Sequence, residues 1–151
     1  MVITINGSSL VRDATIWLRD ILISGISDPI SGNRQTDARF VMTSFPQRPV
    51  DYPLITVKCN LGGDNPIGIG TESRLTPVNW EIRVWSKSVT QKDKLADSIY
   101  SYLRNYQLDA SESVSQGLFN FRITQMFDVD EPGKDGMKSK IIEGKYLFIC
   151  A

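Results

Sequence analysis

The stretch Val78-Asn79-Trp80-Glu81-Ile82-Arg83-Val84-Trp85-Ser86 decides the fold of this chain. Apolar and polar side chains alternate along it, which is the pattern of a β-strand with one buried face. Trp80 belongs to the inward-facing set, whereas Glu81 and Arg83 belong to the outward-facing set. Trp85 also falls on the outward face, where its position leaves two interpretations open: an aromatic residue at a sheet edge, or a residue of an interface.

A second strand and a helix flank this stretch. Residues 54–60 alternate in the same way and predict a strand. After a short polar loop, Lys92–Gln107 carries apolar residues at helical spacing. Thr90 and Asp93 have the spacing of a capping box, which predicts that the helix begins there. The apolar stripe of this helix comprises Leu95, Ile99, Tyr102, Leu103 and Tyr106.

An earlier helix and a short strand precede these elements. The pattern predicts the helix over Ser9–Ile23, with Gly25 as its stop signal. Phe40–Phe45 has the composition of a short strand. The apolar stripe of the first helix comprises Leu10, Ala14, Trp17, Leu18 and Ile21.

Two further strand-like runs follow the second helix, at Leu118–Val129 and Lys140–Cys150. The second run is apolar on both faces, which predicts a central strand. Residues 130–138 between the runs are polar and predict an exposed hairpin tip. The first run is predicted to place one apolar set on a single face: Phe119, Phe121, Ile123, Phe127 and Val129.

Together these elements predict a single α+β domain over residues 1–151, with a mainly antiparallel β-sheet flanked by two amphipathic helices. The length of 151 residues fits one domain of common size. Two glycine-containing loops, at 24–37 and 61–75, are longer than ordinary connections. They hold no reactive residues, so we expect them to contact proteins rather than to take part in catalysis.

The charge of the chain is balanced, with 17 Lys and Arg against 17 Asp and Glu. Proteins that bind nucleic acids usually carry a basic surplus, so we expect no sequence-specific nucleic-acid partner. No apolar run reaches the roughly 18 residues of a membrane span. The N-terminus lacks the features of a signal peptide, which favours synthesis in the cytoplasm and no membrane partner.

The sequence contains no histidine, which removes the commonest general base and a common metal ligand. Its two cysteines, Cys59 and Cys150, lie in strand-like runs and are expected to be buried thiols rather than a disulfide. Acidic residues gather at 128–135, where a solvated turn explains them better than a calcium loop. We therefore expect no catalytic residue, no metal site, no cofactor and no enzymatic activity.

Two segments carry a family resemblance: YPLITV at 52–57 and WEIRVWSKSVTQKDKLADSIYSYL at 80–103. Together with the order of the predicted elements, they resemble the tail terminator, or tail-completion, proteins of long-tailed bacteriophages. The resemblance implies a virion protein at the tail–neck junction, assembled in the host cytoplasm into a homohexameric ring. Such a ring stops polymerisation of the tail tube and offers a docking surface to the neck and head. The implied partners are further copies of this chain, the tail tube protein and a neck or head-completion protein, with DNA passing through the ring.

Two other interpretations remain open. One is another small phage component, such as a head–tail connector, a neck protein or a tube- or baseplate-associated protein. The other is a small enzyme or ligand-binding domain, against which the missing histidine argues. The residues expected at subunit contacts lie on the outward strand face and the hairpin tip: Trp85, Arg83, Asp130, Glu131, Lys134, Asp135 and Lys138.

Overall fold

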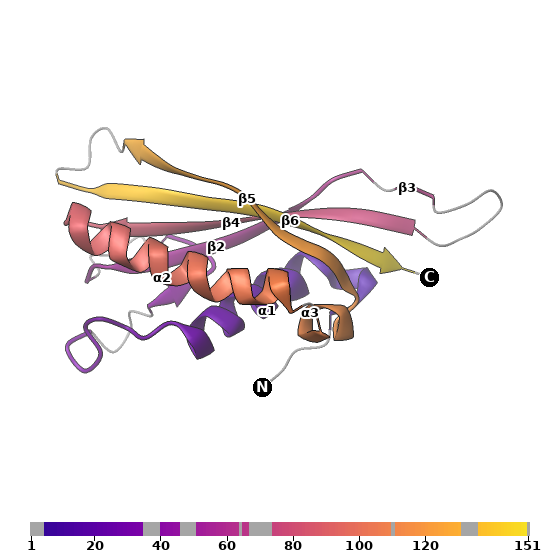
Figure 1. The fold of residues 1–151 in the computed structure, drawn as a ribbon, viewed down its shortest axis with the longest axis horizontal. Helices are drawn as coiled ribbons and strands as arrows, with labels where there is room; N and C mark the ends of the chain where they lie inside the picture. The colour runs from indigo at the N-terminus through magenta and orange to yellow at the C-terminus, as the bar shows by residue number, and fades with distance from the viewer. Residues whose placement is uncertain are drawn as a thin grey trace.

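The structure is a computed structural model that describes residues 5–34, 40–45, 51–63, 65–66, 74–109, 111–130 and 136–150. One long sheet runs the length of the molecule with its helices beneath it (Figure 1). The helical elements are η1 (Gly7–Ser9, a single 3-10 turn), α1 (Leu10–Gly25), α2 (Val89–Leu108) and α3 (Ser111–Ser115). The strands are β1 (Val41–Met42), β2 (Leu54–Leu61), β3 (Asn65–Pro66), β4 (Arg74–Ser86), β5 (Leu118–Asp130) and β6 (Lys138–Cys150).

The sheet has six strands in the order β1-β2-β4-β6-β5, with β3 paired to the start of β4. Every pairing is antiparallel except that of β1 with β2. β6 lies between β4 and β5, which confirms the central strand predicted from its two apolar faces. The predicted α+β class with a mainly antiparallel sheet is likewise confirmed.

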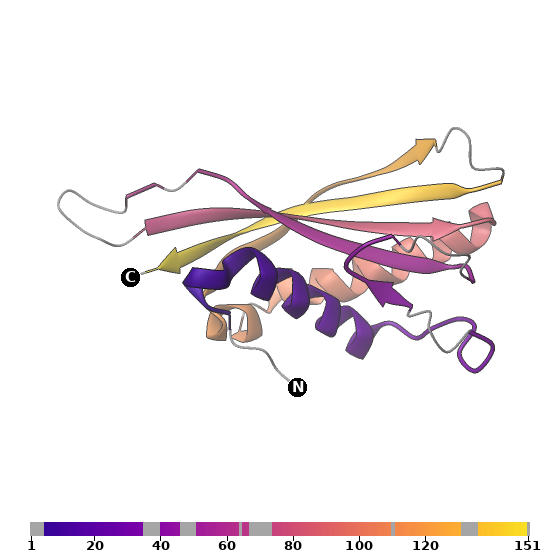
Figure 2. The same ribbon diagram turned by 180° about the vertical axis from the view of Figure 1, so that it is seen from behind.

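Both long helices pack on the same face of the sheet, α1 against β2 and α2 against β4, β5 and β6. Seen from behind, α1 again lies on the same side of the strands as α2 (Figure 2). Among the described elements, no helix covers the opposite face of the sheet. The molecule is therefore built of two layers, one of helices and one of strands.

An aromatic cluster fills the space between these layers. Trp17 of α1 lies edge-on to Phe121 and Tyr146, at ring-centroid distances of 6.2 and 6.4 Å. Trp80 stacks on Phe121 at 5.3 Å. These geometries are favourable for aromatic pairs. The exposed fractions of Trp17, Trp80 and Tyr146 are only 2%, 1% and 0%, which confirms the inward position predicted for Trp80.

Two glycines let side chains approach the backbone closely. A Cβ on Gly144 of β6 would overlap the indole of Trp80, its partner across the strands. A Cβ on Gly25, the last residue of α1, would overlap the ring of Tyr102 on α2. Gly144 therefore leaves room for the Trp80 indole in the core, and Gly25 permits the close contact between the two helices.

The start of α2 differs from the predicted capping box. The helix begins at Val89, and the Oγ of Ser88 accepts a hydrogen bond from the Gln91 backbone N–H at 3.4 Å. Asp93 instead lies 2.9 Å from the ammonium of Lys140. The capping box predicted from Thr90 and Asp93 is therefore wrong: Ser88 is the N-cap, and the Asp93 carboxylate pairs with Lys140 of β6 instead of the helix backbone.

The single apolar face predicted for β5 is also wrong. Two irregularities interrupt its pairing with β6, between Phe119 and Arg122 and between Ile123 and Gln125. Asn120, inside the first, has a φ of 54°, in the left-handed region. Each irregularity shifts the alternation of side chains. Phe121 consequently points into the core, whereas Phe119 and Phe127 point to the other side of the sheet.

Several strand boundaries in the structure differ by a few residues from those predicted. Strand β4 begins at Arg74 rather than Val78, so the predicted loop 61–75 is partly strand. The short strand predicted at Phe40–Phe45 is reduced to β1. Residues 35–37 and 131–135, and most of 64–73, lie outside the described residues, as do parts of the loops and hairpin tip predicted there.

Candidate interaction surfaces

The side of the sheet without helices is the candidate site, and we name it the open face. Alternate residues of β2, β4, β5 and β6 form it. Apolar residues lie at its two ends and charged or amide residues in its middle. The hairpin end comprises Trp85, Phe127, Val129 and Ile141, the middle Lys58, Asn79, Glu81, Arg83, Arg122, Gln125, Glu143 and Lys145, and the C-terminal end Leu75, Pro77, Phe119, Leu147 and Ile149.

Both apolar ends of the open face reach solvent. Phe127 is 37% exposed at the hairpin end, and Ile149 is 42% exposed at the C-terminal end. Val129 and Leu147 beside them are half-buried. Apolar surface of this kind on a strand face is a feature of sites that contact other proteins.

Trp85 lies on this face but is itself buried, with an exposed fraction of 5%. Its ring packs on Phe45 at a centroid distance of 4.6 Å, and its indole N–H donates to Thr56 Oγ1 at 3.0 Å. Because β4 is an inner strand, Trp85 is not the edge aromatic that one interpretation expected. Trp85, predicted as an interface residue, is therefore covered by neighbouring side chains of this chain and contributes little to the solvent-exposed surface of the open face.

Arg83 lies over Trp85, with its guanidinium carbon 5.0 Å from the ring centroid. Its Nε is 3.7 Å from Glu81, which also lies 3.4 Å from the ammonium of Lys58. The Arg83 side chain is 24% exposed. This predicted interface residue thus belongs to a charged row at the surface of the open face.

A second charged group ties the first turn of α2 to the base of the β5–β6 hairpin. The ammonium of Lys92 donates to Asp128 at 2.6 Å, although only 6% of the Lys92 side chain is exposed. Lys140 bridges Asp93 at 2.9 Å and Asp128 at 3.7 Å. Lys92 was not among the residues predicted to make contacts, and its one signal was its position a turn before Leu95 on the buried stripe.

These contacts hold both carboxylates in the ionised form. The hydrogen bond from Lys92 lowers the pKa of Asp128, and that from Lys140 lowers the pKa of Asp93. Asp93 in turn raises the pKa of Lys140. Asp128, which the acidic composition at 128–135 had drawn attention to, is therefore the partner of two lysines.

The other predicted contact residues are only partly placed. Lys138 is half-buried at the start of β6, where its backbone is in register with Asp130. Glu131, Lys134 and Asp135 lie outside the described residues. The structure therefore brings Trp85 and Arg83 together on one surface, whereas the predictions for the hairpin tip stay predictions.

The described part of the loop after α1 is held to the sheet by Arg34. This guanidinium pairs with Asp28 at 2.8 Å and donates to the carbonyl oxygens of Asp51 and Pro53 at 2.8 and 2.6 Å. The hydrogen bond from Arg34 lowers the pKa of Asp28. Residues 28–34 are thus fastened to the chain that leads into β2.

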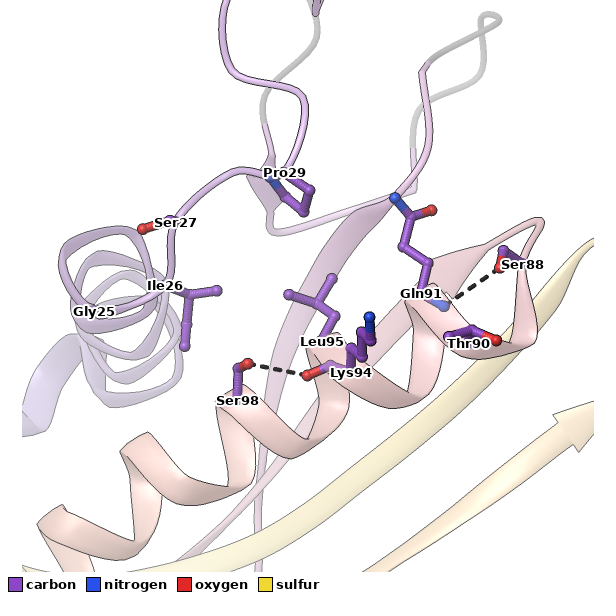
Figure 3. A pocket seen from close by; sticks show the side chains of 10 residues that line it. All are labelled: Gly25, Ile26, Ser27, Pro29, Ser88, Thr90, Gln91, Lys94, Leu95 and Ser98. Atoms are coloured by element: carbon purple, nitrogen blue, oxygen red, sulfur yellow. Dashed lines mark hydrogen bonds between the residues drawn. The ribbon is translucent and has the colours of Figure 1, made fainter.

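A cleft of about 630 Å³ separates the end of α1 from the first turns of α2 (Figure 3). Two of its hydroxyl groups bond to the α2 backbone: Ser88 Oγ accepts from the Gln91 N–H, and Ser98 Oγ donates to the Lys94 carbonyl at 3.0 Å. Its described lining contains no nucleophile with an adjacent base. The lining residues are Gly25, Ile26, Ser27, Pro29, Ser88, Thr90, Gln91, Lys94, Leu95 and Ser98.

Little in the described residues suggests other chemistry. Cys59 is a buried free thiol whose pKa is raised by burial, which makes it a poor nucleophile. The side chain of Cys150 lies outside the description. Among the described residues, no three His, Cys, Asp or Glu side chains are grouped for a metal ion, and none of the helices is long and apolar enough to cross a membrane.

In comparisons with known proteins, no protein-family model matches this chain and no curated protein matches it. A function is therefore argued from the geometry above, together with the resemblance of residue pattern.

Proposed function

We propose that this chain is a structural subunit of a homo-oligomeric ring at the end of a phage tail tube, where it stops tube polymerisation and provides the docking surface for the neck and head. The observation that carries the proposal is the open face, a long sheet surface with apolar ends and no helix over it in the described part of the chain. A sheet with apolar residues on both faces is normally covered on both.

The chemistry of the chain favours a structural role over catalysis. A sequence without histidine needs a shifted carboxylate, lysine or thiol as a general base. The pKa of Asp93 and of Asp128 is lowered by lysine partners, and burial raises the pKa of Cys59. These shifts run against base or nucleophile activity near neutral pH.

Deleting the gene from a phage that encodes this chain tests the proposal. Without a terminator, tubes should grow beyond the normal tail length and fail to join heads, as electron microscopy of lysates would show. Tails of normal length that lack heads would instead favour the neck or connector interpretation. Normal, fully joined virions would contradict a role at either position.

A further inference from the structure

Strand β6 carries a symmetric pattern of side chains on the open face. Read from the hairpin end, the residues on this face include Ile141, Glu143, Lys145 and Leu147. Gly144 stands at their midpoint, with one charged and one apolar residue on each side of it along this face. Reversing the strand about this glycine therefore exchanges apolar residues with each other and exchanges an acid with a base.

The neighbouring strand β5 widens the two apolar ends of this pattern. Phe127 is in register with Ile141, and Phe119 is in register with Leu147. Phe127 is 37% exposed, and Phe119 is half-buried. Each side of Gly144 thus has an aromatic and an aliphatic residue side by side on the open face.

The charged rows between these ends oppose like charges across the strands. Arg122 lies opposite Lys145 in the β5–β6 pairing, and Glu81 lies opposite Glu143 in the β4–β6 pairing. Like charges directly opposite each other destabilise a sheet. Neither Arg122 nor Lys145 forms an ion pair with another described residue. Within the described part of the chain, the basic row therefore has no counter-charge.

We propose that a second copy of this chain packs its open face on the open face of the first, about a twofold axis that crosses the strands at the level of Gly144. This axis reverses the strand direction, so Lys145 of each copy meets Glu143 of the other. Contact between two identical patches is the isologous geometry of a dimer. A twofold axis along the strands would instead place Lys145 over Lys145, and such like-charge contacts disfavour that orientation.

The same operation matches the apolar ends of the two copies. Ile141 of one copy lies over Leu147 of the other, and Phe127 lies over Phe119. Sheets that pack face to face are about 10 Å apart, with the side chains of both inner faces between them. The helices of both copies stay outside, so the pair has four layers in the order helices, sheet, sheet, helices. Apolar residues on both faces of each sheet are then covered.

The contact centres on β5 and β6. At the β2–β4 corner of the open face, Phe45 already packs on Trp85. No described helix lies over the open face at β5 or β6 (Figures 1 and 2). The pair belongs to the free protein and goes beyond the proposed function, because a face covered by a second copy must separate from it before docking on a virion protein.

Charge reversal on β6 tests the axis. Lys145→Glu would oppose two acids across the interface, and Glu143→Lys would oppose two bases. Each change also removes a like-charge pair within its own sheet, so both variants should fold. In analytical ultracentrifugation the wild type should sediment as a dimer of the 17.0 kDa chain, and each single variant should sediment as a monomer at the same concentration.

Two combinations should restore the dimer. An equimolar mixture of the single variants opposes two acids of one copy to two bases of the other. The double variant K145E/E143K exchanges the rows and regains the complementarity of the wild type. Lys94→Glu is the matched control, since it makes the same charge change at an exposed lysine of α2 away from the open face and should leave the dimer intact.

A wild type that stays monomeric at high concentration would overturn the proposed pair. A dimer that persists in Lys145→Glu, or a mixture of single variants that stays monomeric, would overturn it as well. A larger species that is indifferent to the reversals would mean that the subunits join through other surfaces. The phage deletion reports separately: normal virions together with the expected dimer would reject the tail-terminator role and leave the pair standing, whereas overlong tails with a monomeric protein would do the reverse.

Discussion

At the scale of single residues, close packing decides which positions tolerate change. Gly144→Ala would drive a methyl group into the Trp80 ring and towards the Arg122 carbonyl oxygen. Overpacking of a filled core costs roughly 1–3 kcal/mol, and two rigid neighbours place this site near the upper value. We expect the free energy of unfolding, measured by urea titration, to fall by about 3 kcal/mol. Gly63→Ala is the control, since a Cβ there meets nothing within 4 Å; equal stability losses in the two variants would contradict the packing argument.

Capping gives a second prediction at this scale. The structure assigns the cap of α2 to Ser88, whereas the spacing of Thr90 and Asp93 had predicted a capping box. Ser88→Ala should therefore destabilise the protein by about 1 kcal/mol, and Thr90→Ala by much less. Thermal unfolding followed by circular dichroism compares the two. A larger loss of stability from Thr90→Ala than from Ser88→Ala would instead support the capping box formed by Thr90 and Asp93.

At the scale of elements, the lysine–carboxylate group fastens α2 to the β5–β6 hairpin. Lys92→Met keeps the buried stem and removes the charge that bonds to Asp128. Because Asp128 is largely exposed, we expect a loss of only about 1 kcal/mol at neutral pH. The pKa of Asp128 is lowered in the folded state, so this stabilisation exists above the unfolded carboxyl pKa near 4 and disappears as pH falls through the lower folded value.

The wild type should therefore lose more stability than Lys92→Met as the solution is acidified below about pH 4. Urea titrations at a series of pH values measure this difference. Lys94→Met is a suitable control, since Lys94 is an exposed lysine of the same helix that lines the cleft instead. Parallel pH profiles for the wild type and Lys92→Met would show that the Asp128 contact contributes nothing to folding.

Elements also show what the sequence could predict. The alternation at Val78–Ser86 and the stripes of both helices are local patterns, and the structure confirms them. The faces of β5 could not be read in this way, because the two irregularities and the left-handed Asn120 depend on pairing with β6. The burial of Trp85 depends on Phe45, and that of Lys92 on Asp128, which are partners distant in the chain. For the open face, the residues of β4 that point outward were predictable from the sequence. The lack of a helix over this face in the described part of the chain was not.

At the scale of the whole molecule, one core cluster joins both helices to the sheet, and the apolar residues at the ends of the open face lie outside it. If neighbouring subunits cover that face, only the folded chain assembles, and assembly stabilises it by mass action. The melting temperature of the wild type should then rise with protein concentration, with roughly 1 kcal/mol added to the free energy of unfolding per chain for each tenfold increase. Calorimetry of F127K/I149K, which places lysines at the two exposed ends of the open face, should show a melting temperature that is independent of concentration. If the melting temperature of the wild type were also independent of protein concentration, folding and assembly would not be coupled. The open face would then be stable in water without a partner.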